Sequence, residues 1–432
     1  MLKKAEELGL ELPFQDSISP IFEKFTIGSK KVPNRMAVQP MEGFDAELDG
    51  SPSELTLRRY KRYAEGGSGL IWFEATSVVP EGRSNPRQMM LSARNLDVFK
   101  RLIEKTRNSA HQIFGSSQEV FCVLQLTHSG RYSKPEGKPG PQVVCLNPLL
   151  DKQRRNIHII SDEELDRLQD KYVETARLVY QAGFDAVDIK ACHGYLLNEL
   201  LAGYTRENSR YGVSFENRSR FLKEVIQKVH NEVPEICIAV RLNAYDGIPH
   251  SFGVSKDGSL DIDLSEPQEL VRQLTLSGCS LFNITVGIPY FSPHLGRPFD
   301  CPISDASLPE EHPLEGVARL LKVTGEFQKE SPDIPFVGTG YSWLRHFLPC
   351  VGAAVIKRGE ASLIGLGRSS FAYPDAPKEL MSSGEMDQKK ACITCSRCSE
   401  LMRHGHVSGC VVHDTEIYGK EYQKLSLKGK KE

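Results

Sequence analysis

Short apolar runs recur along this chain at intervals of roughly 35 to 50 residues, and each run is followed by apolar residues at helical spacing. Strands that are nearly continuous in apolar residues and alternate with helices are typical of a parallel sheet covered on both faces. Eight such units within about 330 residues predict an α/β fold, a (β/α)8 TIM barrel. The eight runs are Arg35–Gln39, Gly69–Phe73, Val120–Leu126, Ala186–Ile189, Ile236–Leu242, Leu281–Val286, Pro335–Gly338 and Ser362–Gly365.

The helix expected before the fourth run has recognisable signals at both ends. Ser161 followed by Glu164 three residues later forms a capping box, which satisfies backbone N–H groups of a first helical turn. An apolar stripe that includes Leu165, Leu168 and Tyr172 follows. Gly183 can end the helix in the left-handed conformation, so the pattern predicts a helix between Ser161 and Gly183.

Composition narrows the possible partners and locations. The net charge is -2 and 25% of residues are charged, which predicts no strongly basic face and no nucleic-acid partner. No apolar run reaches the roughly 18 residues of a transmembrane helix, so we expect no membrane association. The first residues lack the apolar core of a secretory signal, and the cysteine count of eleven is odd, which together predict reduced thiols and a cytoplasmic location.

Four of the eleven cysteines are crowded into 19 residues. Thiolates are soft ligands that suit zinc or an iron–sulfur cluster. Three cysteines at intervals of three, with a fourth further on, favour [4Fe–4S], because structural zinc sites usually divide their ligands two and two. A zinc site and unligated cysteines remain the alternatives. We expect a barrel over residues 1–380 and a C-terminal extension over residues 381–432 that holds the cluster. The four expected metal ligands are Cys392, Cys395, Cys398 and Cys410.

Polar residues stand at the end of every expected strand, where the active sites of such barrels gather. Gln125 and Arg241 lie inside apolar runs and need partners if they are buried. A flat heteroaromatic ring such as a flavin would supply those partners. The glycine turns Gly338–Gly340 and Gly367–Arg368 follow the last two runs, and their N–H groups and guanidinium could bind a phosphate. Other polar residues at strand ends are Glu42, Glu74, Thr76, His128, Arg131, Lys190, His193, Tyr195, Tyr290 and His294.

Taken in order from Phe22 to Asp375, these motifs resemble the Old Yellow Enzyme family of FMN-dependent reductases. The cysteine group resembles the 2,4-dienoyl-CoA reductase and trimethylamine dehydrogenase branch, which carries a [4Fe–4S] cluster after the barrel. The motifs are Pro40-Met41, Glu74-Ala-Thr76, Gln125-Leu-Thr-His128-Ser-Gly-Arg131, His193-Gly-Tyr195-Leu-Leu, Ser209-Arg-Tyr-Gly212, Glu216-Asn-Arg218 and Gly365-Leu-Gly367-Arg368.

Enzymes of that branch continue into FAD- and pyridine-nucleotide-binding domains. The printed sequence ends 22 residues after Cys410, and no GxGxxG follows a strand. We therefore expect no second flavin, which leaves open whether electrons come directly from a nicotinamide or from a redox partner protein. The sequence also leaves open whether the chain forms a homo-oligomer.

For cofactor binding, the resemblance implies FMN, with Arg241 facing the N1/O2 edge of the ring, Gln125 pairing with its pyrimidine edge and Ala75 allowing close backbone approach. NADH or NADPH is the implied reductant. The full set of implied cofactor residues is Pro40, Met41, Ala75, Gln125, Arg241, Gly340, Gly367 and Arg368.

The resemblance also implies a reaction, the reduction of a C=C bond conjugated to a carbonyl. The substrate would be a hydrophobic enone, such as a steroid or bile acid, or an enoyl thioester. His193 and Lys190 are the expected donors to the carbonyl oxygen, although many relatives have histidine in place of Lys190, which suggests a different substrate. Tyr195 is the expected general acid, with His294 as a second candidate.

Two other functions remain possible on the sequence. One is oxidative amine demethylation, like that of trimethylamine dehydrogenase, and the other is an electron-transfer flavoprotein subunit. An amine demethylase needs an aromatic bowl for its cationic substrate. The chain has only two tryptophans, Trp72 and Trp343, and their positions do not indicate such a bowl.

Overall fold

A computed structural model describes residues 1–116, 118–152, 156–304 and 306–428 of the chain. Eight parallel strands close into a barrel, in which the last strand pairs with the first. Every predicted run contains or overlaps one of them, which confirms the (β/α)8 TIM barrel. The barrel strands are β3 (Met36–Val38), β4 (Leu70–Ser77), β5 (Phe121–Thr127), β8 (Ala186–Ile189), β9 (Cys237–Asn243), β10 (Cys279–Thr285), β11 (Phe336–Gly338) and β12 (Leu363–Leu366).

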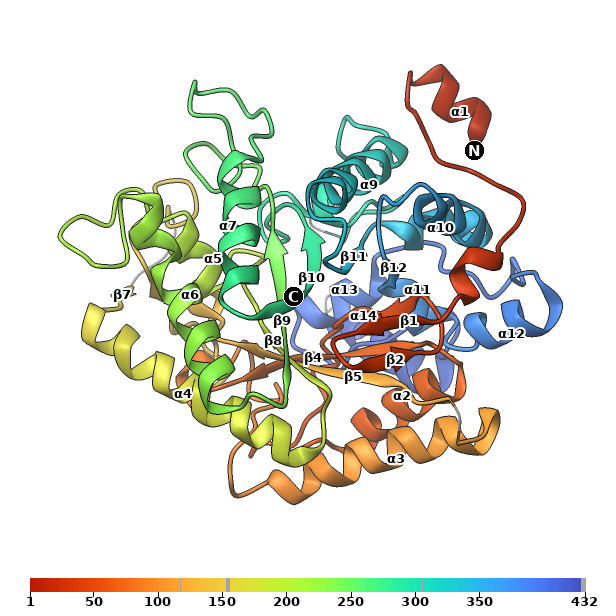
Figure 1. Cartoon of the computed structure of the whole chain (residues 1–432), viewed down its shortest axis with the longest axis horizontal. Coiled ribbons are helices and arrows are strands. Elements are labelled where there is room, and N and C mark those ends of the chain that lie inside the picture. The colour runs from red at the N-terminus through yellow and green to blue at the C-terminus, as the bar shows by residue number, and fades with distance from the viewer. Residues whose placement is uncertain (117, 153–155, 305, 429–432) are drawn as a thin grey trace.

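Helices lie between successive strands and cover the outside of the barrel (Figure 1). The longer ones are α2 (Glu54–Glu65), α3 (Leu96–Phe114), α4 (Asp162–Ala182), α6 (Phe215–Glu232), α7 (Ser265–Leu276), α9 (Pro313–Glu330), α10 (Leu348–Lys357) and α12 (Ala376–Ser383). Shorter ones are α1 (Leu2–Glu7), η1 (Ser19–Phe22), η2 (Pro80–Gly82), η3 (Gly130–Tyr132), α5 (Leu196–Leu201), α8 (Pro293–Gly296), η4 (Tyr341–Phe347) and α11 (Arg368–Ala372).

The predicted ends of α4 are confirmed. The Ser161 side chain accepts a hydrogen bond from the Glu164 backbone N–H at 3.2 Å, and the Glu164 carboxylate accepts one from the Ser161 N–H at 2.7 Å. Gly183 ends the helix with φ of 95°, a conformation that costs glycine least because it has no Cβ. Helix α4 is therefore fixed at both ends by its local sequence.

An antiparallel hairpin closes the N-terminal end of the barrel. Its strands are β1 (Phe25–Ile27) and β2 (Lys30–Val32), which the sequence analysis did not predict. Ile27 and Val32 are fully buried and pack against apolar residues that point into the barrel. These apolar side chains fill the barrel interior at this end, so the polar residues where the strands finish are the candidates for a ligand site. The barrel residues in this cluster are Ala37, Leu70, Trp72, Phe121, Val123, Ala186, Ala239, Leu281, Val337 and Leu363.

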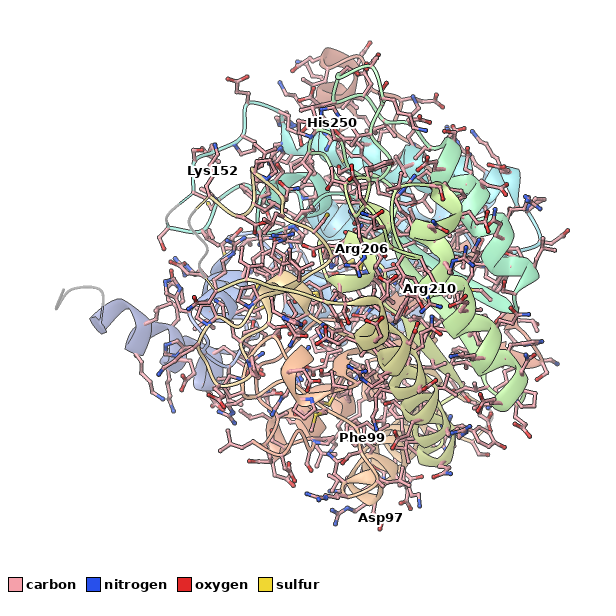
Figure 2. The ribbon with its side chains drawn as sticks, turned by 90° about the vertical axis from the view of Figure 1, so that its left-hand side faces the viewer. Asp97, Phe99, Lys152, Arg206, Arg210 and His250 are labelled. Atoms are coloured by element: carbon pink, nitrogen blue, oxygen red, sulfur yellow. The ribbon has the colours of Figure 1, made fainter. Side chains whose placement is uncertain are left out.

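The long segment between β5 and α4 is tied to the loop after β8. Two short strands, β6 (Gln142–Val143) and β7 (His158–Ile159), pair within its described part. The Arg206 guanidinium, labelled in Figure 2, donates to the Val144 carbonyl oxygen and to the Asp162 carboxylate, each at 2.7 Å. These bonds hold two of the loops that follow barrel strands against each other.

The C-terminal extension contains α13 (Arg397–Arg403), the π-helical η5 (Thr415–Gly419) and α14 (Lys420–Lys428). The Asp414 carboxylate accepts hydrogen bonds from Arg58 at 2.7 Å and from Arg62 at 2.6 Å, both on α2. Helix α12 crosses residue 380, so the division into residues 1–380 and 381–432 stays a prediction, and residues 429–432 lie outside the described part. Among the described helices, none is both long and apolar enough to cross a bilayer.

Candidate active site

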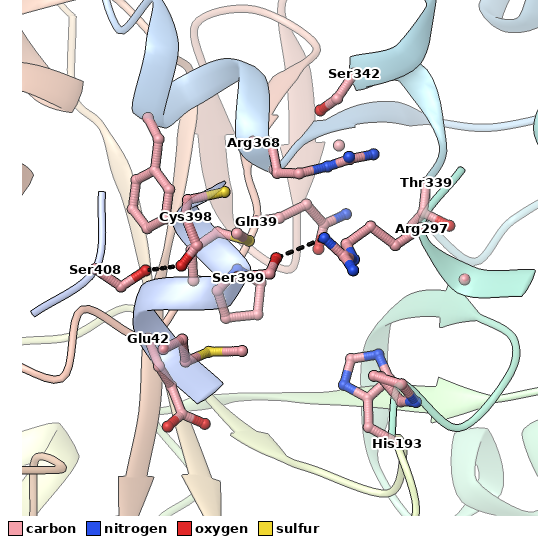
Figure 3. A pocket seen from close by; sticks show the side chains of 18 of the residues that line it. Gln39, Glu42, His193, Arg297, Thr339, Ser342, Arg368, Cys398, Ser399 and Ser408 are labelled. Atoms are coloured by element: carbon pink, nitrogen blue, oxygen red, sulfur yellow. Dashed lines mark hydrogen bonds between the residues drawn. The ribbon is translucent and has the colours of Figure 1, made fainter. Parts of the chain in front are cut away.

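A cavity opens at the C-terminal end of the barrel, where the loops after the strands meet the extension (Figure 3). Nine of the twelve residues that the sequence analysis assigned to catalysis or FMN line it. The extension adds Cys398, Ser399, Met402, Arg403 and Ser408 to the wall, which the sequence did not indicate. The nine predicted residues are Pro40, Met41, Lys190, His193, Tyr195, Arg241, Gly340, Gly367 and Arg368.

Gln125 and Ala75 are not part of this lining. The Gln125 amide donates to a carboxylate oxygen of Asp188 at 2.6 Å, inside the barrel. The Trp72 indole donates to the same oxygen at 2.8 Å, and the Arg241 backbone N–H donates to the other at 2.7 Å. Burial raises the pKa of Asp188 to about 6. Asp188 thus satisfies Gln125 beneath the cavity, and the predicted contacts of Gln125 and Ala75 with FMN stay predictions.

Two buried guanidinium groups at the cavity have unsatisfied donors. Arg241 Nε and Arg368 Nη1 have no hydrogen-bond partner, although the residues are only 8% and 6% exposed. A second nitrogen of Arg368 donates to the Pro298 carbonyl oxygen. A buried donor without an acceptor costs roughly 1–3 kcal/mol. Both arginines therefore fit a bound group that carries acceptor atoms, as the sequence analysis expected of FMN.

Arg297 is a site residue that the sequence analysis missed. It lies in the loop after β10 and donates to the Ser399 hydroxyl at 2.5 Å. Burial and the neighbouring Arg368 lower its pKa to about 9. Two guanidinium groups close together repel each other unless an anion lies between them. No motif surrounds Arg297 in the sequence, so only the fold could reveal it.

Arg297 and Arg368 lie at one end of the cavity, together with residues of the loops after β11 and β12. Figure 3 shows Arg297, Arg368, Thr339 and Ser342 in the upper part of the view, with Glu42 and His193 in the lower part. Gly340 also lines the cavity and has φ of 98°, a conformation that favours glycine. We call Arg297, Arg368, Thr339, Gly340 and Ser342 the arginine end.

His193 and Lys190 lie near Tyr195 after β8. His193 has a positive φ of 66°, which is unusual for a residue other than glycine and marks a sharp turn after the strand. Burial, Arg241 and Lys190 lower the pKa of His193 well below its usual value, so the imidazole is neutral near neutral pH. The Lys190 ammonium lies 3.9 Å from the centroid of the Tyr195 ring. A neutral His193 can donate one hydrogen bond to a substrate carbonyl.

The Tyr195 hydroxyl faces two groups whose roles the sequence left unassigned. It donates toward a Glu42 carboxylate oxygen at 3.5 Å, and the Tyr290 hydroxyl lies 3.4 Å away. The Tyr290 ring stacks on that of Tyr132 with centroids 3.7 Å apart. We call Glu42, Lys190, Tyr195 and Tyr290 the tyrosine end. A carboxyl group and two phenols within hydrogen-bond range can pass a proton among themselves.

His294 lies outside this group. It is on α8, its Nε2 is 4.0 Å from a carboxylate oxygen of Glu311, and it does not line the cavity. Tyr290, from the same loop after β10, lines the cavity instead. The arrangement favours Tyr195 over His294 as a proton donor, while the role of either residue stays a prediction.

The four clustered cysteines surround a second, smaller cavity. Cys398, Arg368 and Phe371 line both cavities and form a shared wall between them. Thr394 and Ser396, between the cysteines, have positive φ of 52° and 58°. Such strained conformations outside glycine cluster at functional sites. The fold therefore brings Cys392, Cys395, Cys398 and Cys410 together beside the first cavity.

The spacing of these thiols bears on what they could hold. Among the described residues, no three Cys, His, Asp or Glu side chains converge closely enough for a single metal ion. A zinc ion needs four ligands at about 2.0–2.3 Å from one atom. In a [4Fe–4S] cluster each thiolate binds a different iron around a larger cubane. Both zinc and [4Fe–4S] are held by thiolates, and the cluster stays a prediction.

With this geometry described, comparison with known proteins decides the family. Residues 20–260 match the sequence profile of the NADH:flavin oxidoreductase / NADH oxidase family. The chain belongs to this family. The predicted relationship is confirmed at that level, while the assignment to a cluster-bearing branch is not tested by the match.

Individual members of the NADH:flavin oxidoreductase family extend the similarity along the chain. NADH oxidase of Thermoanaerobacter brockii is 27% identical over 387 residues, which is 87% of this chain and 52% of that protein. Bilirubin reductase of Mediterraneibacter gnavus is 25% identical over 94% of this chain and 58% of its own length. The chain thus spans about half the length of these relatives.

A solved structure supports the fold. A 2-naphthoyl-CoA reductase in complex with 2-naphthoyl-CoA superposes with a TM-score of 0.74 at 19% identity, over 94% of this chain and 58% of that one. At this identity the likeness concerns the fold alone.

Proposed function

We propose that the chain is an FMN-dependent NAD(P)H oxidoreductase that reduces a C=C bond conjugated to a carbonyl group. The observation that carries the proposal is one cavity with the unsatisfied guanidinium of Arg368 beside Arg297 at one end and Tyr195 with His193 at the other. The first arrangement suits an anionic cofactor, and the second suits an uncharged acceptor that gains a proton. The family match and a relative named as a reductase of bilirubin agree with this reading.

FMN fits the chemistry of the lining. Arg297 and Arg368 would hold its phosphate with charge-assisted hydrogen bonds, helped by backbone N–H groups near Gly340 and Gly367. Arg241 would place a positive charge at the ring, and Pro40 and Met41 would lie along it. When bound, FMN would take a hydride from NADH or NADPH and pass it to the β-carbon of the substrate.

The protein's own residues would then handle charge and proton. Negative charge grows on the substrate carbonyl oxygen, and donors aimed at such an oxygen are each worth roughly 3 kcal/mol. His193 and Lys190 line the cavity and would supply these donors. Tyr195 would give its phenolic proton to the α-carbon.

The charge of the lining argues against the amine alternative. Five cationic side chains line the cavity, and Glu42 is the one carboxylate among its described lining residues. A cationic amine would be repelled by this field. Trp72 is 1% exposed and bonded to Asp188, and Trp343 donates to Asp300 at 2.8 Å, so neither belongs to an aromatic cage in the cavity. The five cations are Lys190, Arg241, Arg297, Arg368 and Arg403.

The four cysteines fit a [4Fe–4S] cluster as a second cofactor. Because Cys398 belongs to the wall of both cavities, a cluster held there would lie next to FMN and could exchange single electrons with it or with a partner protein. We expect the protein to act in the reducing environment of the cytoplasm, as the odd cysteine count predicts.

Anaerobic purification followed by FMN, iron and sulfide analysis tests the cofactors. Reduction with NADH or NADPH and reoxidation with a panel of enones, enoyl thioesters and amines tests the reaction. We expect one FMN and about four irons per chain, and reoxidation by an enone or enoyl thioester. Flavin reduction by an amine, with no reoxidation by any activated alkene, would contradict the proposal.

A further inference from the structure

Glu42 has two carboxylate oxygens in different surroundings. Oε2 accepts a hydrogen bond from the Ser84 hydroxyl at 2.9 Å. Oε1 faces the Tyr195 hydroxyl at 3.5 Å and the Lys190 ammonium at 3.9 Å. The Glu42 side chain is 10% exposed and that of Lys190 is 5% exposed. Glu42 is thus a buried acid at the cavity whose Oε1 faces the phenol that the proposed reaction uses.

The contact between Glu42 and Lys190 is too long to be a tight ion pair. Close charge-assisted N–H···O bonds are about 2.7–2.9 Å long, whereas this separation is 3.9 Å. Burial raises the pKa of Glu42 and lowers that of Lys190. The groups that face Glu42 are Ser84 from the loop after β4 and Lys190 and Tyr195 from the loop after β8, and the buried carboxyl of Glu74 on β4 interacts with it electrostatically. Their arrangement allows Glu42 to carry a proton in the resting site.

Proton donation by Tyr195 creates a demand that Glu42 can meet. A phenolate at position 195 would lie beside a buried carboxyl, and burial together with Glu42 already raises the pKa of Tyr195 well above its usual value. The phenolate therefore needs a proton at once. Tyr290 is a phenol like Tyr195 and is ordinarily no more acidic, whereas a carboxylic acid is far more acidic than a phenol. Glu42 is the stronger donor of the two groups within reach.

We propose that Glu42 is the proton relay for Tyr195. The proposal rests on the proposed function. The Tyr195 O–H bond breaks as the α-carbon gains its C–H bond, and the Glu42 O–H bond breaks as the Tyr195 O–H bond forms again. Glu42 is left as a carboxylate that Lys190 stabilises, and it takes one proton from solvent before the next turnover. One proton is thus consumed for each hydride transferred.

Repeated turnover separates the relay from the donor. The FMN-loaded protein, reduced anaerobically with NADH, is mixed with an enone that the parent protein reduces, across pH 5.5 to 9. With Glu42→Gln the first turnover should keep most of its rate, because Tyr195 still holds its proton. Later turnovers should slow by on the order of 10²-fold, and their loss of rate at high pH should disappear.

Two matched variants locate the route. Ser84→Ala removes a hydrogen bond that favours ionised Glu42, so the pH midpoint of the parent profile should rise. Tyr290→Phe tests the competing path through the more exposed phenol, and the relay predicts that the pH midpoint does not move. A parent-like pH profile in Glu42→Gln, or loss of the profile in Tyr290→Phe, would overturn the relay.

A measurement without substrate keeps this test separate from the proposed reaction. Infrared difference spectra between pH 5.5 and 9 should show a protonated carboxyl band in the FMN-loaded parent that Glu42→Gln lacks. If no enone reoxidises the parent flavin, the proposed function fails while this band still reports the proton on Glu42. If Glu42 is ionised throughout this range, the relay is wrong, whatever the substrate.

Discussion

The two ends of the cavity differ in how their charged and polar groups are paired. At the arginine end, Arg368 keeps a buried nitrogen without a partner and Arg297 lies beside it as a second cation. At the tyrosine end, Glu42, Lys190 and Tyr195 face one another at 3.5–3.9 Å. The arginine end lacks an anion to accept hydrogen bonds from its guanidinium groups. At the tyrosine end the polar groups face one another, and protons can move between them. Binding and chemistry should therefore fail separately when either end is altered.

The largest expected effect tests whether the cysteines, rather than a phosphate, balance the arginine end. Cys395→Ser should abolish cluster absorbance and remove essentially all iron, because one thiolate ligand is lost. FMN affinity should change little if phosphate is the partner of Arg297 and Arg368. Iron analysis and FMN titration of the apoprotein measure both, and Cys301→Ser, an exposed cysteine outside the four, is the control. Stoichiometric zinc in the parent protein would disprove the cluster.

Tyr195→Phe should slow reoxidation of the reduced flavin by an enone about 10²–10⁴-fold, because the general acid is lost. Flavin reduction by NADH or NADPH and FMN content should stay near those of the parent. A nitroalkene should lose much less rate, since its product anion is stable without an immediate proton. Stopped-flow measurement of the two half-reactions shows the difference. If His294→Ala carries the loss instead, the donor lies in the loop after β10.

Arg297→Ala and Arg368→Ala should each weaken FMN binding by roughly 10- to 100-fold, the worth of a charge-assisted hydrogen bond. The corresponding lysine variants keep the charge but lose the planar fork, and they should recover part of the affinity. Fluorescence titration of the apoprotein with FMN gives the dissociation constants. A large loss of alkene reduction at saturating FMN would contradict the claim that the arginine end serves binding and the tyrosine end serves chemistry.

The smallest expected effect concerns the extension that completes the wall. Asp414→Asn keeps the size of the side chain and weakens its bonds to Arg58 and Arg62, for a cost of about 1 kcal/mol. Limited proteolysis should cut the extension sooner, while the barrel stays resistant. Glu416→Gln, whose side chain is exposed, is a matched control of the same chemistry. Equal cleavage rates in both variants would mean that Asp414 does not anchor the extension.

The barrel strands could be predicted because they are buried on both faces and therefore nearly continuous in apolar residues. The ends of α4 could be predicted because Ser161, Glu164 and Gly183 act through their own backbone neighbours. The β1–β2 hairpin was missed because three-residue strands carry little pattern, and only Ile27 and Val32 mark its buried face.

The parts of the site that were missed depend on contacts between distant residues. Glu42 and Tyr195 are 153 residues apart and meet only because β3 and β8 belong to one closed ring. The Gln125 amide donates to Asp188 on the neighbouring strand, a pairing that no motif indicated. Arg297 stands in no motif. Residue type and position at a strand end thus predict which side chains reach the cavity, but not which of them pair.

The β1–β2 hairpin at the N-terminal end of the barrel has a consequence for the order in which substrates bind. Ile27 and Val32 fill one end of the barrel interior, and the described cavity lies at the other end. In the proposed reaction, the nicotinamide and the alkene would bind in the same cavity one after the other, and the oxidised nicotinamide would leave before the alkene binds. Steady-state kinetics should then show the parallel double-reciprocal lines of a ping-pong mechanism. An excess of either compound should inhibit, because it would bind to the form of the enzyme that reacts with the other.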